Sequence, residues 1–85
     1  MAIHHELFHA IADPGSAAAR AFVVEHALEG KVRFRNVCYE EVQADLRQRS
    51  STGEVVTPAL WDGHALVEGE AAVLEGLRRL VGSPG

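Results

Sequence analysis

Two histidines near the start of the chain have the spacing of a metal site. His5-Glu6-Leu7-Phe8-His9 fits the H-E-x-x-H pattern, in which two imidazoles bind zinc and the glutamate activates a water molecule. The pattern works on a helix, because positions i and i+4 share one face. On a strand the two histidines would lie about 13 Å apart, whereas two ligands of one zinc ion lie only about 3–4 Å apart. The chemistry of this motif therefore depends on the element that carries it.

The rest of the chain favours a strand at this place. Residues 6–12, ELFHAIA, are short, contain several apolar side chains and end before a Pro-Gly turn, as does a strand buried on both faces. A helix over residues 2–12 would align Ile3, Leu7 and Ile11, so periodicity alone leaves both structures open. A strand supplies the parallel partner that the following crossover helix needs, and no downstream residue has a recognised third-ligand spacing. We therefore predict a strand and no metal site.

The composition excludes several classes of function. The 85 residues suffice for one small globular domain, with 47% hydrophobic and 24% charged residues. A formal net charge of −4 without a Lys/Arg cluster argues against nucleic acid as a partner. No apolar run is long enough to span a membrane, so we expect a cytoplasmic protein. We predict one domain over residues 1–82, followed by a tail at 83–85.

Cys38 is the single cysteine of the chain. It has no intramolecular disulfide partner and cannot form a two-cysteine redox centre. A lone thiol is most often a small packing residue or a passively exposed group, and an intermolecular disulfide or a modified thiol is the alternative. We expect a monomer or a weak dimer.

Turn signals and periodicities divide the chain into seven elements in the order β-α-β-α-β-β-α. The predicted strands cover residues 6–12, 31–35, 59–61 and 65–67, and the predicted helices cover 16–28, 40–48 and about 69–81. This order predicts an α/β fold with a mixed four-stranded sheet flanked by helices. A right-handed crossover should make the first two strands parallel, and the second strand should lie at an edge.

The same patterns predict helix ends, ion pairs and buried side chains. The first helix should have Asp13 as its N-cap, Pro14 at its first position and Gly30 after its end. We also expect an ion pair between Asp45 and Arg49 and another between Glu75 and Arg79. Each predicted helix should bury one apolar stripe, and four aromatic residues should also lie in the core. The stripes are Ala17, Ala21, Val24 and Leu28 in the first helix, Val42 and Leu46 in the second, and Val73, Leu77, Leu80 and Val81 in the third; the aromatic residues are Phe8, Phe22, Phe34 and Trp61.

Three short segments, in this order, resemble the glutaredoxins and more broadly the thioredoxin fold. Asp13-Pro14-Gly15-Ser16 stands where that family has C-x-x-C, Val56-Thr57-Pro58 resembles its T-V-P element, and Glu68-Gly69-Glu70 matches the turn into its last helix. The resemblance covers nearly the whole chain. It implies a cis bond at Pro58 and a groove in which Thr57, Pro58, Glu68, Gly69 and Glu70 would bind a peptide or glutathione.

The chain departs from that family at the chemically decisive positions. Both thiols of C-x-x-C are missing, and a serine hydroxyl at Ser16 stays protonated and carries no redox couple. We therefore expect no dithiol oxidoreductase activity. Two acidic residues at the start of the last helix would weaken binding of the glutathione carboxylate. Asp13 either caps the helix or places a carboxylate where the family has a thiolate.

A second likeness concerns residues 57–77, which are similar to the N-terminal domain of glutathione transferases. In some of those enzymes a serine opens the first helix, as Ser16 does here, but the Glu-Ser pair is imperfect and the helical second domain is missing. Three hypotheses follow. The main one is a binding or interaction module with a vestigial glutathione or peptide groove. The alternatives are a glutathione-dependent enzyme that uses Ser16 and a monothiol redox role for Cys38.

Overall fold

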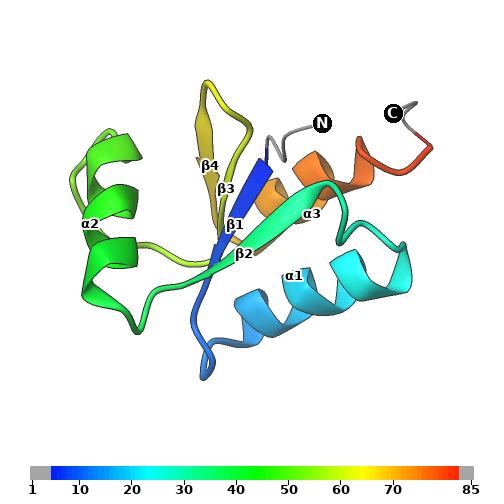
Figure 1. Cartoon of the computed structure of the whole chain (residues 1–85), viewed down its shortest axis with the longest axis horizontal. Coiled ribbons are helices and arrows are strands. Elements are labelled where there is room, and N and C mark those ends of the chain that lie inside the picture. Colours follow the sequence, from blue (N-terminus) through cyan, green and yellow to red (C-terminus); the bar gives the residue numbers. More distant parts are fainter. Residues whose placement is uncertain (1–4, 83–85) are drawn as a thin grey trace.

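The computed structural model describes residues 5–82, which form a four-stranded mixed sheet and three helices (Figure 1). The strands are β1 (His5–His9), β2 (Val32–Asn36), β3 (Ala59–Trp61) and β4 (Leu66–Glu68), and the helices are α1 (Pro14–Glu25), α2 (Glu40–Arg49) and α3 (Glu70–Arg78). The sheet order is β2-β1-β3-β4. Strand β1 is parallel to β2 and antiparallel to β3, which is antiparallel to β4. The predicted α/β class, mixed sheet and edge position of β2 are confirmed.

The HELFH segment forms β1, a central strand, as predicted. In the parallel register His5 pairs with Val32 and His9 with Asn36. Leu7 and Phe8 are both fully buried but belong to different core clusters, because successive side chains point to opposite faces. The strand ends at His9, sooner than predicted. The N–H of Asp13 donates to the carbonyl of Ala10 at 3.3 Å and starts a turn there.

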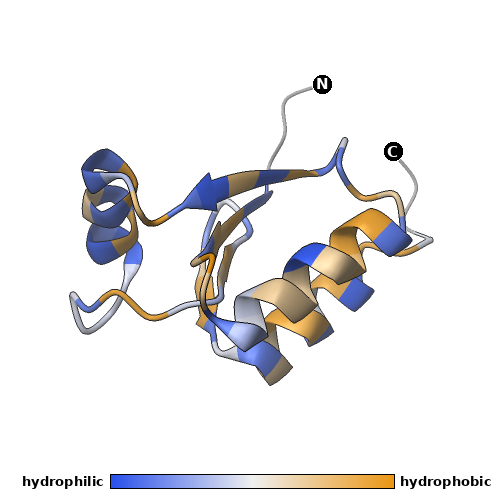
Figure 2. Ribbon diagram, turned by 90° about the horizontal axis from the view of Figure 1, so that it is seen from below, coloured by the Kyte–Doolittle hydropathy of each residue, from blue (hydrophilic) through white to orange (hydrophobic). Residues whose placement is uncertain are grey.

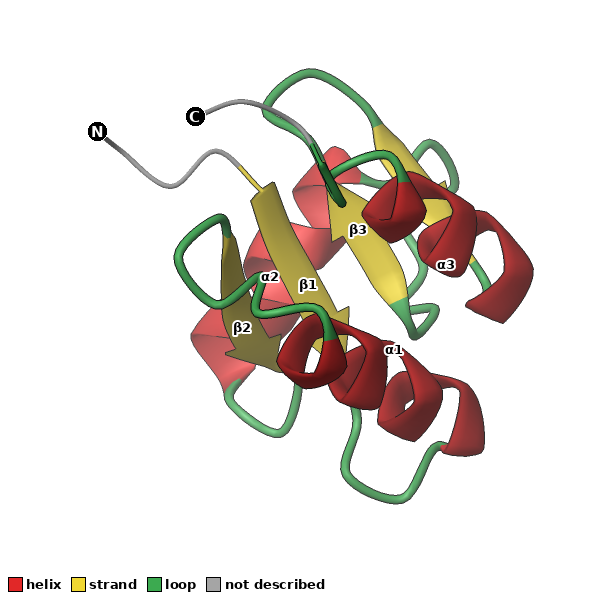
Figure 3. Cartoon of the chain, turned by 90° about the vertical axis from the view of Figure 1, so that its right-hand side faces the viewer, coloured by secondary structure: helices red, strands yellow, loops and turns green. Residues whose placement is uncertain are grey.

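The two faces of the sheet carry different layers (Figure 3). Helices α1 and α3 run side by side on one face, and α2 lies on the other (Figures 2 and 3). The core under α1 and α3 consists of Leu7, Ala19, Val23, Leu28, Val32, Leu60, Val73 and Leu77. The smaller core under α2 consists of Phe8, Val42, Leu46 and Ala59. The larger core holds together the elements that carry the predicted site.

Helix α1 buries a different face from the one predicted. Ser16, Ala19 and Val23 are fully buried, whereas Val24 is 59% exposed. Alanines lie on several faces of this helix, so apolar periodicity did not single out the side that meets the sheet. The helix also ends at Glu25 and not near Gly30, because the N–H of Leu28 donates to Val23 and the chain turns away.

The charged residues under α2 form ion pairs that differ from the predicted one. Asp45 forms an ion pair with Arg35 of β2 at 2.7 Å. The predicted ion pair between Asp45 and Arg49 is therefore wrong. Arg49 instead lies 2.9 Å from Glu6, which also contacts Arg35. The guanidinium of Arg49 lies 4.9 Å from the ring centre of Trp61. Helix α2 is mostly hydrophilic in Figure 2, and these contacts fasten it beside its two buried residues.

Two further predictions about apolar side chains were wrong. Phe34 is 40% exposed, because β2 is an edge strand with a neighbouring strand on one side only. Its ring contacts the His9 ring, with 5.4 Å between the ring centres. Val81 is 43% exposed, since α3 ends at Arg78 and the chain turns before it. The predicted core positions Val73 and Leu77 are fully buried.

The β3–β4 connection is a tight hairpin, as predicted. Asp62 accepts hydrogen bonds from the N–H groups of His64 and Ala65, both at 2.8 Å, and Gly63 adopts the positive φ of 100° that the turn requires. Among the helices of residues 5–82, none is long and apolar enough to cross a bilayer.

Candidate functional site

Asp13-Pro14-Gly15-Ser16, which the resemblance aligned with C-x-x-C, lies after the C-terminal end of β1, where the chain enters α1. Asp13 is the N-cap of α1, and Pro14 is its first residue, as predicted. The loop of residues 55–58 approaches from the other side and contains a cis Thr57-Pro58 bond, as the resemblance implied. Asp13, Gly15, Ser16, Thr57, Pro58 and Glu70 come together here and are called the Asp13 cluster below.

One carboxylate oxygen organises the polar part of the Asp13 cluster. Asp13 Oδ2 accepts hydrogen bonds from the Ser16 hydroxyl at 2.7 Å, from the Ser16 N–H at 3.2 Å and from the Thr57 hydroxyl at 3.2 Å. The hydrogen bond from Ser16 holds the pKa of Asp13 below its ordinary value, with further help from Thr57 and against the effect of burial. A carboxylate anion therefore occupies the N-terminus of α1.

The hydroxyl of Ser16 forms two hydrogen bonds within the protein, one as donor and one as acceptor. The hydroxyl donates to Asp13 and accepts the N–H of Ala10 at 3.0 Å, and the residue is fully buried. It thereby fastens the end of β1 to the first turn of α1. A reacting molecule would have to displace both partners to reach its oxygen.

Close packing joins the cis bond to the start of α3. A Cβ atom added to Gly15 would lie 3.0 Å from Pro58 Cδ and 3.3 Å from Glu70 Cβ, so only glycine fits between them without a shift. The carbonyl of Pro58 accepts the N–H of Gly69 at 2.9 Å. Gly69, the N-cap of α3, is thus already engaged, and Glu70 stands at the first helical position beside α1.

Glu68 and Cys38 lie outside the Asp13 cluster. Glu68 pairs with Ala59, whose side chain belongs to the core under α2, so Glu68 faces that layer as well. Within residues 5–82, its Oε2 atom is buried without a hydrogen-bond partner. Cys38 is an exposed free thiol in the turn after β2, where its N–H donates to Asn36 Oδ1 at 2.9 Å.

His9 and Arg20 support the cluster, and neither was predicted to do so. Arg20 Nη1 lies 3.1 Å from His9 Nδ1 and donates to the carbonyl of Ala10 at 3.1 Å. Burial, followed by the nearby charge of Arg20, lowers the pKa of His9 below its ordinary value, which favours a neutral imidazole. The position of Arg20 one turn after Ser16 was the only signal in the sequence for this contact.

The histidines of HELFH are separated by the length of β1. His5 and His9 share one face of the strand but lie about 13 Å apart at a rise of about 3.3 Å per residue. Within residues 5–82, no three side chains of His, Cys, Asp or Glu gather closely enough to hold one metal ion. His4 lies outside the described residues.

No protein-family model matches this chain, and no curated protein is significantly similar to it.

Proposed function

We propose that this chain is a glutaredoxin-like domain of the thioredoxin fold that has no dithiol redox activity and binds an extended peptide segment at the Asp13 cluster. Three observations support the family assignment: the element order, the sheet order β2-β1-β3-β4 and the cis Thr57-Pro58 bond beside the N-terminus of α1. A fold does not carry a function by itself, so the binding role depends on the site.

The proposed binding role depends mainly on the main-chain N–H and C=O groups of Thr57. Within residues 5–82, neither its N–H nor its C=O forms a hydrogen bond. An extended peptide can pair with both groups as an added strand does. The Thr57 side chain is held by Asp13, and the next residue, Pro58, is packed against Gly15. The peptide-binding groups are therefore fixed in position before the ligand arrives, which reduces the entropy cost of binding.

The charges of the site define what such a peptide would carry. Asp13 is held as an anion, and Glu70 adds a second carboxylate next to Gly15. Both disfavour the carboxylates of glutathione, which leaves glutathione as the weaker candidate ligand. A peptide with a neutral or basic residue facing Asp13 and Glu70 fits this charge better.

Ser16 favours binding over catalysis. A hydroxyl that activates the thiol of glutathione must reach that thiol, whereas Ser16 is fully buried between Asp13 and Ala10. In a glutathione-coupled assay of disulfide reduction, we expect no turnover above the uncatalysed rate.

A selection from a random-peptide library tests the proposal without assuming a sequence. We expect peptides enriched on the wild-type chain to lose binding to Thr57→Pro, which removes the N–H that pairs with the ligand. Thr57→Val is the matched control, because it keeps the main-chain N–H and replaces only the hydroxyl that contacts Asp13 with a methyl group. Equal binding of the enriched peptides to folded Thr57→Pro protein, or no enrichment at all, would contradict the proposal.

A further inference from the structure

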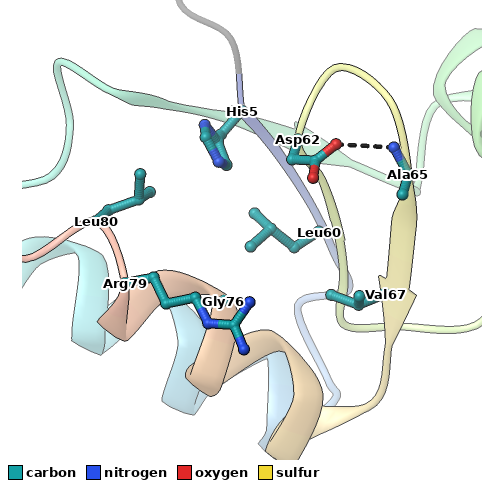
Figure 4. Close-up of a pocket in the computed structure, with 8 residues that line it drawn as sticks. All are labelled: His5, Leu60, Asp62, Ala65, Val67, Gly76, Arg79 and Leu80. Carbon is teal, nitrogen blue, oxygen red and sulfur yellow. Dashed lines mark hydrogen bonds between the residues drawn. The ribbon is translucent and has the colours of Figure 1, made fainter. Parts of the chain in front are cut away.

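A pocket lies at the other end of β1 from the Asp13 cluster. It is a pocket of about 150 Å³ between the β3–β4 hairpin and the C-terminal half of α3 (Figure 4). Its lining residues are His5, Leu60, Asp62, Ala65, Val67, Gly76, Arg79 and Leu80. Since His5 begins β1 and Asp13 follows its end, the pocket is independent of the proposed peptide site.

Apolar side chains form the floor of the pocket. Leu60 points into it from β3, Val67 flanks it on β4, and Leu80 closes the far side (Figure 4). The floor is tightly fitted to α3, because a Cβ atom on Gly76 would lie 2.8 Å from Leu60 Cδ2. A side chain at position 76 would therefore push Leu60 out of its place. The absence of one keeps the space above Leu60 open.

Two opposite charges stand on different walls, with Leu60 between them (Figure 4). Hydrogen bonds from the N–H groups of Ala65 and His64 hold the pKa of Asp62 below its ordinary value, so this carboxylate is charged at neutral pH. On the helix wall, Arg79 Nε is 4.0 Å from Glu75 Oε1, at the limit of an ion pair. Both side chains of that pair are more than half exposed, and the contact leaves the guanidinium able to bind an anion.

The volume limits the ligand to a small molecule. Pockets that take drug-sized ligands measure about 300–1,000 Å³. An apolar cavity of about 150 Å³ holds benzene, so the space fits about six to eight non-hydrogen atoms. The pocket is large enough for a short aliphatic chain with a charged group at each end.

We infer that this pocket binds a small ω-amino acid, with its ammonium group on Asp62, its carboxylate on Arg79 and its methylene chain on Leu60. The separation of the two charges by an apolar floor selects this class over an α-amino acid, whose charges lie on one carbon. A molecule with only one of the charges leaves the opposite wall unpaired.

Nuclear magnetic resonance titration with 4-aminobutyrate tests this inference. We expect saturable shifts of the amide signals of Ala65 and Gly76. Butyrate and butylamine, which each lack one charge, should bind about tenfold more weakly or worse, because hydrogen bonds to charged groups are worth about one power of ten or more. Valine should also bind more weakly than 4-aminobutyrate.

Two substitutions assign the charges to residues. Arg79→Gln and Asp62→Asn should each weaken binding of 4-aminobutyrate about tenfold or more. Asp62→Asn retains an oxygen that can accept the N–H groups of His64 and Ala65, so the hairpin keeps its turn. Arg47→Gln on α2 is the matched control, because it removes the same charge from a residue that does not line the pocket. Absence of saturable shifts, equal binding of butyrate or butylamine, or unchanged affinity in both pocket variants would overturn the inference.

Discussion

The two faces of the sheet are held by different forces. Helices α1 and α3 cover one face with an apolar core of eight residues, of which five are fully buried: Leu7, Ala19, Val23, Val73 and Leu77. On the other face, α2 contributes only Val42 and Leu46 to a core of four residues. Charged contacts among Glu6, Arg35, Asp45 and Arg49 supplement that smaller core. Apolar burial thus fixes one layer, and ionic and aromatic contacts fix much of the other.

The Asp13 cluster, where we propose that a peptide binds, belongs to the apolar layer. Its parts come from the N-terminal ends of α1 and α3 and from the loop before β3. The layer under α2 supplies none of them. Disturbing α2 should therefore lower the stability of the protein without changing the geometry of the cluster.

Truncating one leucine in each layer should have the largest effect. We expect Leu77→Ala to lower the free energy of unfolding by about 3–4 kcal/mol and Leu46→Ala by about 2–3 kcal/mol. Both side chains are fully buried, but the smaller core around Leu46 can relax further around the cavity. Urea unfolding of the two variants measures the difference. A loss for Leu46→Ala as large as that for Leu77→Ala would show that apolar burial contributes equally to both layers.

Removing the charge of Glu6 should have the next largest effect. Its side chain is 17% exposed and contacts Arg35 and Arg49, so Glu6→Gln leaves two guanidinium groups without their shared anion. We expect a loss of about 2 kcal/mol, less than for a fully buried pair. High salt should reduce the stability of the wild-type chain more than that of the variant.

The control for this prediction is Glu75→Gln on the exposed side of α3. Glu75 pairs with Arg78 at 2.7 Å, but both side chains are more than half exposed. Its loss should cost less than about 1 kcal/mol. Equal losses for Glu6→Gln and Glu75→Gln would show that the contacts under α2 do not stabilise the fold.

A change of pH separates the two layers without destabilising substitutions. Burial and then Arg20 lower the pKa of His9, in the layer of α1, below its ordinary 6.5. Burial raises the pKa of Glu6, under α2, but Arg49 and Arg35 outweigh this effect and hold it below its ordinary 4.5. In both cases the unfolded chain binds the proton first, so stability falls as the pH decreases.

We expect a first loss of stability as the pH falls below 6.5, from His9, and a second below 4.5, to which Glu6 contributes. Urea unfolding between about pH 3 and 8 resolves the two ranges. His9→Gln should abolish the first loss, and Glu6→Gln should reduce the second. A first loss that persists in His9→Gln would assign it to another group.

The sequence predicted the elements better than it predicted the faces. The HELFH strand, the hairpin at Asp62 and the parallel pairing of the first two strands followed from length, turn residues and chain order. The buried side of α1 did not, because alanines surround that helix and Val23 and Val24 are equally apolar neighbours. The ion pairs under α2 join residues far apart in the chain, which helical spacing cannot detect.

In the candidate site, local sequence patterns predicted the helix cap, but they did not predict the directions of the side chains. The Asp13 cap was expected from turn chemistry, and the cis bond at Pro58 was expected from the resemblance. Glu68 was expected beside Glu70, but the alternation of β4 turns it toward the layer of α2. The engagement of His9 by Arg20 depends on how α1 packs, which only tertiary structure defines.

Peptide binding at the Asp13 cluster is tested by following the amide signals of the chain while a library-selected peptide is added. We expect the largest shift at Thr57, smaller shifts at Ser16 and Glu70, and no change over residues 40–49 of α2. In Thr57→Pro, the same peptide should leave the amide signals of Ser16 and Glu70 unshifted. Largest shifts around α2 or around the pocket at Asp62 and Arg79, with Thr57 unchanged, would contradict peptide binding at the Asp13 cluster.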